Sequence, residues 1–256
     1  MIRLLLIFTF ISAICIKVVA QDNLNSPKDL ILLIGQSNMA GRAPLLPVDD
    51  KVIEGAFLYD SLNHWTPLKN PLNIHSLIRK TARMQKLNLS YTFAKKMIET
   101  NTLNPIGLVV NARGGTKIQA WVPGTFYYKE AVRRSLEAMK EGAKFRAVLR
   151  HQGEGNLNDD TDTDYDGYFE KLKSIIHQLR KDLKNDKLIF IAGELNKDTP
   201  KNIRFKSMLA RLETEVSNAG SVKSEGTKTK DDTHFDNEGL KIRGNRYAEK
   251  LISIMN

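Results

Sequence analysis

Four runs of consecutive apolar residues stand out along the chain, and each is followed by a glycine or a polar residue. Runs of this kind are typical of strands in a parallel sheet, because helices cover both faces of such a sheet. The sequence therefore predicts four buried strands, at residues 29–35, 106–110, 145–149 and 188–192.

The segments between these runs show helical spacing of their apolar residues. Strands that alternate with helices predict a parallel sheet with helices on both faces, since each crossover carries the chain back over the sheet. Ligands bind outside the carboxyl ends of the strands in such sheets. The predicted helices lie at residues 91–100, 127–141, 165–183, 202–217 and from about 236 to the end.

Residues 42–90 do not follow this alternation. They contain Pro44, Pro47, Pro67 and Pro71 and show no clear periodicity. We expect a long irregular excursion there, and excursions of that length often serve as lids or substrate walls.

The first 20 residues have the layout of a secretory signal peptide. Arg3 precedes an apolar run over residues 4–16, and Ala20 is a small residue suited to a cleavage site. A membrane anchor is the alternative, but Lys17 interrupts the run before it reaches the ~20 residues that a bilayer span needs. We therefore expect a secreted or periplasmic protein, without stable membrane insertion after cleavage.

Composition narrows the class of protein further. Cys15 is the only cysteine, so the mature chain offers no thiol nucleophile, disulfide or thiolate metal site. Lipid attachment at Cys15 is a weaker alternative to cleavage, because Ile14 is bulkier than lipoprotein processing usually accepts. Residues 21–256 suit a single α/β domain with a full core.

The formal charge of +10 is dispersed over helical patterns rather than concentrated in one arm. No basic stripe interleaved with aromatic residues occurs, so we expect no nucleic-acid partner. A weak attraction to acidic polysaccharides remains open.

Ser37 follows the first predicted strand directly, within the segment Gly35-Gln36-Ser37-Asn38-Met39. A lone serine in a turn is usually a cap or turn residue. The segment also lacks the second glycine of the Gly-x-Ser-x-Gly elbow. A catalytic role for Ser37 therefore depends on its partners.

Suitable partners occur near the C-terminus, where Asp231 precedes His234 by three residues. A serine hydroxyl needs a base to take its proton, and the base needs an acceptor that orients it. At this spacing the Asp231 carboxylate can reach Nδ1 of His234 and leave Nε2 for Ser37. The alternative is that Asp231 caps the last helix and His234 is a surface residue, and Asp232 is a neighbour that could be mistaken for Asp231.

Two segments at strand ends could supply donors to an oxyanion. After the second strand, the backbone amides of Gly114 and Gly115 can approach a substrate without a Cβ in the way. After the third, Gln152 can offer its side-chain amide. A metal site built from His151, Glu154, His234 and Asp231 is a less favoured alternative, because the usual metal-ligand spacings are missing. His64, His75 and His177 have no obvious partners.

Together, these segments resemble the sialate O-acetylesterase-like branch of the SGNH hydrolases, which includes the family-six carbohydrate esterases and acetylxylan esterases. The resemblance spans roughly residues 30–251, and Arg150 and Gly155 depart from the residues common at their positions. The motifs that carry it are Gly35-Gln36-Ser37-Asn38-Met39, Gly114-Gly115-Thr116 with Ile118 and Trp121, His151-Gln152-Gly153-Glu154, and Asp231-x-x-His234.

The resemblance implies a flavodoxin-like three-layer α/β/α sandwich with a central parallel sheet, and a serine esterase without cofactor or metal. It implies Ser37 as nucleophile, His234 as general base and acid, and Asp231 as its orienting carboxylate. The implied oxyanion donors are the Ser37 amide, an amide of the Gly114-Gly115 pair, and Gln152. Supporting roles fall to Gln36, Asn38 and Glu154.

The implied substrate is an acetylated oligosaccharide or polysaccharide such as acetylxylan. Acetylated sialic acid is one alternative, and a non-catalytic carbohydrate-binding protein is another. Trp121 and Trp65 could stack on a sugar ring, although tryptophans in a domain of this size are more often core.

Overall fold

The computed structural model describes residues 26–140, 142–157, 164–196 and 198–256. The predicted signal peptide and Cys15 lie outside these residues. Within the described ranges, no helix combines the length and the apolar character that a bilayer span requires.

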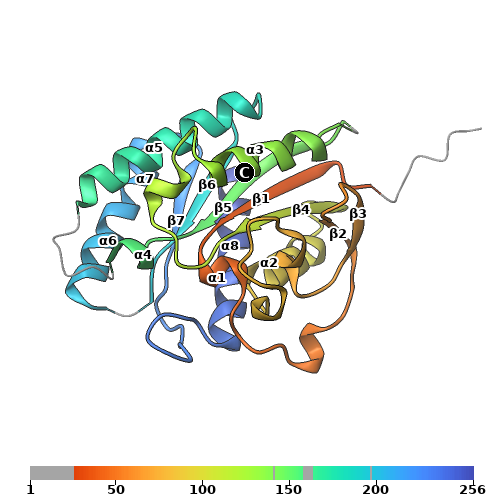
Figure 1. Ribbon diagram of the computed structural model, residues 1–256, viewed down its shortest axis with the longest axis horizontal. Helices are drawn as coiled ribbons and strands as arrows, with labels where there is room; N and C mark the ends of the chain where they lie inside the picture. The colour runs from red at the N-terminus through yellow and green to blue at the C-terminus, as the bar shows by residue number, and fades with distance from the viewer. Residues whose placement is uncertain (1–25, 141, 158–163, 197) are drawn as a thin grey trace, which may run out of the picture.

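A seven-stranded sheet forms the centre of the fold (Figure 1). Its order is β3-β2-β4-β1-β5-β6-β7, and all neighbouring strands are parallel except the antiparallel pair of β2 and β3. The strands are β1 (Asp29–Gly35), β2 (Ile53–Tyr59), β3 (Trp65–Leu68), β4 (Ile106–Ala112), β5 (Lys144–His151), β6 (Ile189–Gly193) and β7 (Ala219–Val222).

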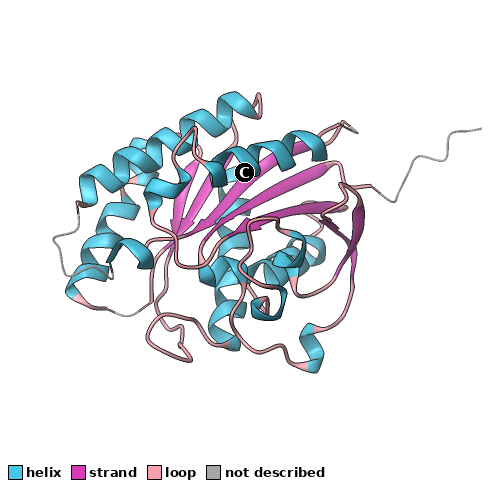
Figure 2. Cartoon of the chain, viewed as in Figure 1, coloured by secondary structure: helices cyan, strands magenta, loops and turns pink. Residues whose placement is uncertain are grey.

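Helices cover both faces of the sheet, so the predicted three-layer α/β/α fold is confirmed (Figure 2). The α-helices are α1 (Ser37–Ala40), α2 (Leu89–Glu99), α3 (Phe126–Ala138), α4 (Glu154–Leu157), α5 (Tyr165–Asp182), α6 (Pro200–Ala210), α7 (Leu212–Glu215) and α8 (Asn237–Met255). Short 3-10 helices occupy Pro47–Asp49, Leu72–His75, Ala82–Met84 and Ile118–Trp121.

Several helices begin at a residue whose side chain satisfies a free backbone amide of the first turn. Asn88, Asp164 and Asp236 accept hydrogen bonds from the amides of Ser90, Gly167 and Gly239, respectively. Thr199 caps α6 in the same way, and Pro200 follows it at the first helical position, where its fixed φ suits the helix.

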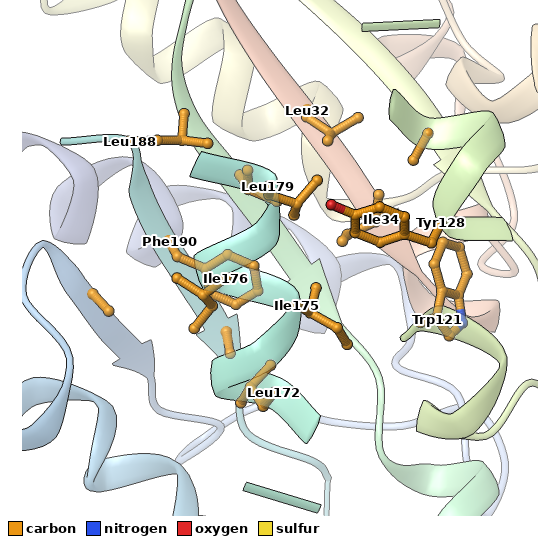
Figure 3. Packing of buried hydrophobic residues seen from close by; sticks show 14 of the residues in the cluster. Leu32, Ile34, Trp121, Tyr128, Leu172, Ile175, Ile176, Leu179, Leu188 and Phe190 are labelled. Atoms are coloured by element: carbon orange, nitrogen blue, oxygen red, sulfur yellow. The ribbon is translucent and has the colours of Figure 1, made fainter. Parts of the chain in front are cut away.

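The alternating side chains of β1 enter two separate cores. Leu32 and Ile34 pack against α3 and α5, together with Trp121, Tyr128 and Ile175 (Figure 3). Ile31 and Leu33 face the opposite layer, where α2 and α8 supply Phe93, Met97, Tyr247 and Leu251. β1 is fully buried on both faces, as its continuous apolar run predicts.

The order β4-β1-β5-β6-β7 reverses direction at β1, because the chain first adds β4 on one side and later adds β5 on the other. In doubly wound sheets the crevice at such a switch point is where ligands bind. The carboxyl ends of β1 and β5, which carry the Ser37 and His151-Gln152 segments, therefore meet where a site is expected.

The prediction for residues 42–90 was wrong in one respect, because β2 and β3 lie within this segment and extend the sheet beyond β4. β7 was also missed, and the helix predicted at residues 202–217 divides into α6 and α7 at Arg211. The other predicted strands and helices are present, with ends shifted by a few residues.

Candidate active site

Ser37 is the first residue of α1, and only Gln36 separates it from the end of β1. The amide of Gln36 donates to the carbonyl of His151 at 2.9 Å, so the turn is fixed to the end of β5. Because Ser37 is the first residue of the helix, its backbone amide has no hydrogen-bond acceptor within the helix. The Ser37 side chain is 6% exposed, at the sheet edge that the sequence predicted.

Gly114 lies against Ser37. A Cβ at residue 114 would stand 3.4 Å from Cβ of Ser37 and 2.8 Å from Nη2 of Arg42. The amide of Arg113 donates to the carbonyl of Gly35 at 2.9 Å, which fixes this approach. The turn that contains Gly114 therefore lies in contact with Ser37, and a side chain at residue 114 would displace the guanidinium of Arg42.

Asp231 and His234 form a hydrogen-bonded pair. Nδ1 of His234 lies 3.0 Å from Oδ1 and 2.9 Å from Oδ2 of Asp231. Oδ1 also accepts from the backbone amides of Thr233 and His234, at 2.9 and 2.7 Å. Nε2 of His234 is left for another partner, which is the orientation that the sequence predicted.

The Asp231 carboxylate is stabilised in its charged form. Partial desolvation would raise its pKa, but hydrogen bonds from Lys230 and from the amides of Thr233 and His234, together with the imidazole, hold the pKa well below its ordinary value. Asp231 therefore stays ionised at neutral pH and can orient His234 and stabilise its positive charge.

Asn38 holds the His234 loop beside Ser37. Its Nδ2 donates to the carbonyl of Thr233 at 3.1 Å, and its Oδ1 accepts from the amide of Phe235 at 3.1 Å. The residue after Ser37 thus bonds to both neighbours of His234. Ser37 Oγ and His234 Nε2 share no hydrogen bond in the described part of the chain; in unliganded sites such bonds are often long or misaligned and tighten with substrate.

Gln152, a predicted oxyanion donor, makes hydrogen bonds within the protein. Its Nε2 donates to the carbonyl of Thr116 and to Oδ1 of Asn156, both at 2.9 Å, and contacts Oε1 of Gln36 at 3.3 Å. Both amide hydrogens are therefore engaged, and neither is free for a substrate oxygen. The hydrogen bonds of Gln152 favour a role in joining the ends of β1 and β5 over the predicted role as an oxyanion donor.

Gln36 contributes to the same junction. Its Oε1 accepts from the amide of Gly155 at 3.1 Å and from that of Gly153 at 3.4 Å. Arg150, fully buried, donates to Oε1 of Gln152 at 2.8 Å. The side chains at this end of β5 form a connected polar network beneath the site rather than a binding surface.

His151 and Glu154 form a second histidine–carboxylate pair, which lies in the interior. Nε2 of His151 is 3.0 Å from Oε1 of Glu154, and the same oxygen accepts from Nδ2 of Asn38 at 2.6 Å. Burial lowers the pKa of His151. Desolvation would raise the pKa of Glu154, but His151 and Asn38 lower it. Both side chains are buried and bonded to each other, so the pair belongs to the interior rather than to the surface of the site.

The alternative of a metal site finds no support in the described residues, because no three His, Cys, Asp or Glu side chains gather there in a metal-binding arrangement. His151 and Glu154 bond to each other, and Asp231 bonds to His234. His75 lies in a 3-10 helix, and burial lowers its pKa.

Trp121 belongs to the core and does not face the site. It is 1% exposed, packs with Tyr127, and donates from Nε1 to Oγ1 of Thr116 at 2.9 Å. Trp65 lies in β3 beside Tyr59, and it approaches Gly107 near the start of β4. The buried indole of Trp121 is therefore not available to stack on a sugar.

A cavity of about 550 Å³ lies beside the His234 loop. It is lined by Glu154 and Leu157 on one side, by Asp232 and Thr233 on another, and by the start of α6. Cavities of this size accommodate small ligands. The cavity adjoins the two residues that precede His234, whereas Ser37 and His234 themselves do not line it.

Sequence reasoning missed the parts of the site that depend on tertiary contacts. It assigned Asn38 only to the shape of the turn and did not identify Arg243, whose guanidinium lies 3.3 Å from Nδ1 of His151. One signal for Arg243 was present: it occupies the buried face of α8, at helical spacing from Leu240 and Tyr247.

Residues 27–253 match a family described as carbohydrate esterase, sialic acid-specific acetylesterase. A probable carbohydrate esterase of Arabidopsis thaliana is 32% identical over 174 residues, which cover 61% of this chain and 65% of that protein. The matched region thus spans just under two thirds of the length of this curated relative.

Two solved structures are similar along nearly the whole chain. An Arabidopsis thaliana protein aligns with a TM-score of 0.79 and 26% identity, over 89% of this chain and 98% of that one. NanS aligns with a TM-score of 0.69 and 16% identity, over 90% and 98% of the two chains. At this identity the likeness to NanS concerns the fold alone.

Proposed function

Because the chain belongs to the carbohydrate esterase family of sialic acid-specific acetylesterases, we propose that it is a serine esterase that hydrolyses O-acetyl esters of carbohydrates. Ser37 is the nucleophile, His234 the general base and acid, and Asp231 the carboxylate that orients His234. The substrate is an acetylated oligosaccharide or polysaccharide.

The first half of the reaction transfers the acetyl group to the enzyme. Ser37 Oγ attacks the acetyl carbonyl carbon while Nε2 of His234 takes the hydroxyl proton. The tetrahedral intermediate collapses, the bond from the carbonyl carbon to the sugar oxygen breaks, and His234 returns the proton to that oxygen. The sugar leaves as an alcohol, and the acetyl group remains on Ser37.

The second half restores the enzyme. Water attacks the acetyl carbon while His234 takes a proton from the water. The bond between that carbon and Ser37 Oγ breaks, Oγ takes the proton from His234, and acetic acid leaves and ionises in solution. Negative charge develops on the carbonyl oxygen in both halves, and the amide of Ser37 with an amide of Gly114 or Gly115 supplies the donors. Each such donor contributes on the order of 3 kcal/mol to transition-state stabilisation.

One observation carries this proposal: Asn38, adjacent to Ser37, bonds to the residues on both sides of His234. Asp231 holds Nδ1 of that imidazole at 2.9 Å. A nucleophile, a base and an orienting carboxylate from opposite ends of the chain are thereby kept at one edge of the sheet. A serine that served only to form a turn would not require a histidine and a carboxylate at the same edge of the sheet.

The experiment is hydrolysis of p-nitrophenyl acetate by the wild type, Ser37→Ala and Ser135→Ala. Ser135 is also a buried serine, on α3, and its hydroxyl donates to the carbonyl of Ala131, away from the site. We expect Ser37→Ala to lose at least 10³-fold in kcat and Ser135→Ala to keep wild-type kcat, given the effects of removing a triad nucleophile. Equal rates for wild type and Ser37→Ala would remove the esterase assignment.

A second candidate substrate, an acetylated acidic sugar such as sialic acid, is favoured by the charges near Ser37. Nη2 of Arg42 lies 2.8 Å, and Nζ of Lys80 3.4 Å, from the positions that a Cβ would take at Gly114 and Gly115, respectively. Residues 61–98 contain no aspartate or glutamate. Two cations beside the proposed oxyanion donors favour a substrate that carries a carboxylate.

Acetate release from acetylxylan and from O-acetylated sialic acid distinguishes the two candidates. Preference for the acidic sugar should fall in Arg42→Gln and Lys80→Gln and with rising salt, because the attraction is electrostatic. A preference for acetylxylan that neither variant alters would support the neutral polysaccharide.

Export is part of the proposal: residues 1–20 act as a signal peptide, and residues 21–256 form the mature esterase. N-terminal sequencing of the exported protein tests this directly. A sequence that begins at residue 21 supports it, and a chain that retains residue 1 contradicts it.

A further inference from the structure

Arg243 is a buried cation for which the proposed mechanism has no use. It lies on α8 and is 0% exposed. Nη1 donates to the carbonyl of Lys223 at 3.3 Å, whereas Nε has no hydrogen-bond partner among the described residues. A guanidinium is costly to bury unless its interactions compensate, so this placement requires an explanation.

The fold leaves space for this guanidinium beside His151. A Cβ at Gly193, the last residue of β6, would overlap Nη2 of Arg243 and the hydroxyl of Tyr247, and it would stand 2.8 Å from Nδ1 of His151. Only glycine allows the three groups to converge at the end of β6. The contact between Arg243 and His151 therefore depends on the absence of a side chain at residue 193.

Arg243 and Glu154 together define which nitrogen of His151 carries the proton. Nη2 of Arg243 lies 3.3 Å from Nδ1 of His151, and a guanidinium can only donate. Nδ1 must therefore be the acceptor, and the proton of the neutral ring is on Nε2. Nε2 then donates to Oε1 of Glu154 at 3.0 Å.

Glu154 in turn fixes the orientation of the Asn38 amide. Oε1 of Glu154 can only accept, so the group 2.6 Å away must be Nδ2 of Asn38 and not Oδ1. That choice directs Oδ1 to the amide of Phe235 and leaves the second hydrogen of Nδ2 for the carbonyl of Thr233. Each bond in the series that connects Arg243 with the backbone on either side of His234 therefore has a defined donor and a defined acceptor.

A second contact leads from Arg243 to the same loop. The guanidinium carbon lies 4.6 Å from the centroid of the Phe235 ring, and the His151 ring meets that ring edge-on at 5.7 Å. Phe235 is 0% exposed and follows His234 directly. Arg243 therefore acts on the His234 loop both through hydrogen bonds and through the packing of Phe235.

We propose that Arg243 is a positioning residue for His234, acting through His151, Glu154 and Asn38 and by stacking on Phe235. The proposal rests on the function assigned above to His234. The guanidinium does not touch the substrate; it keeps the His234 imidazole at the angle and distance from which Nε2 can take the proton of Ser37. Loss of the donor affects catalysis by displacing a base, and small displacements of reacting groups are costly in rate.

The variants Arg243→Met and Arg243→Lys test this, with Arg134→Met as the matched control. Arg134 is also a fully buried arginine whose Nε lacks a partner, but it donates to the carbonyls of Tyr59 and His75. We expect Arg243→Met to lower kcat roughly 10-fold to 100-fold with KM changed less than about threefold. Arg243→Lys, which keeps a donor, should lose several-fold less, and Arg134→Met should keep kcat within about twofold although it is less stable.

A spectroscopic measurement on the wild type keeps the proposal testable if Arg243→Met does not fold. The ¹⁵N shifts of His151 should be pyridine-like for Nδ1 and pyrrole-like for Nε2, and in a folded Arg243→Met the preference for this tautomer should weaken. A wild-type His151 protonated on Nδ1 would overturn the proposal.

Kinetic outcomes separate this proposal from the proposed function. If Ser37→Ala is inactive while folded Arg243→Met keeps the wild-type kcat, the positioning role fails and the esterase assignment stands. If Ser37→Ala keeps the wild-type rate, the assignment of His234 fails, whatever the tautomer of His151.

Discussion

Asp231 contacts Nδ1 of His234 with both carboxylate oxygens, at 3.0 and 2.9 Å, and the same carboxylate accepts the backbone amide of His234 at 2.7 Å. The Asp231 carboxylate therefore holds both the side chain and the backbone of His234. The imidazole cannot rotate about χ2 without losing the contact with Asp231, and Nε2 keeps a constant direction.

Asp231→Asn is expected to lower kcat on the order of 10²-fold to 10⁴-fold with a smaller change in KM, because an amide can hold the wrong tautomer of His234. Asp232→Asn provides the neighbouring control and should stay within about threefold of wild type. Steady-state kinetics on p-nitrophenyl acetate measure both. A larger loss in Asp232→Asn than in Asp231→Asn would transfer the orienting role to Asp232.

The depressed pKa of Asp231 also predicts how stability depends on pH. The folded state holds this pKa below the ordinary value of 3.8, so the unfolded chain binds the proton more readily. The stabilisation is fully present above pH of about 4 and is lost as pH falls toward the folded pKa. The gap in urea midpoint between wild type and Asp231→Asn should therefore be larger at pH 6 than at pH 3, and an equal gap at both would contradict this.

Gln152→Met distinguishes a joining role for Gln152 from a role in the oxyanion hole. Its loss leaves the buried Arg150 and Tyr168 without the oxygen that they share. We expect the free energy of unfolding to fall by about 2–4 kcal/mol, as for a broken buried network. Urea unfolding and kcat are compared on the same preparations: a 10²-fold lower kcat with unchanged stability would restore the oxyanion role.

Trp121→Phe tests the assignment of this residue to the core. The substitution removes the hydrogen bond to Thr116 and part of a well-packed ring, so the free energy of unfolding should fall by about 1–3 kcal/mol. KM for a polymeric acetylated substrate should stay within about twofold, since the indole is 1% exposed. A tenfold rise in KM without loss of stability would indicate stacking on a sugar.

The parts of the fold that the sequence predicted are those with a strong local signal. β1, β4 and β6 are largely apolar runs, β5 is apolar apart from Arg146 between Phe145 and Leu149, and the long helices have buried faces at regular spacing. β7 was missed because its sequence, Ala-Gly-Ser-Val, is short and carries little apolar surface. β3 contains Pro67, which is tolerated because β3 is the antiparallel edge strand of the sheet.

In the site, too, the sequence predicted the features with a local signal and missed those that depend on tertiary contacts. The sequence placed Ser37, Gly114 and His151 at strand ends, because topology brings the carboxyl ends of parallel strands together. It could not predict that both hydrogens of the Gln152 amide are engaged. That outcome depends on acceptors from Thr116 and Asn156, which approach only in the folded chain.

The bond between Asn38 and Phe235 spans 197 residues. During synthesis Ser37 emerges early, whereas Asp231 and His234 follow almost 200 residues later. A nascent chain with β1, β4, β5 and β6 already paired therefore still lacks two members of the proposed triad, which is complete only after the segment before α8 has joined the fold.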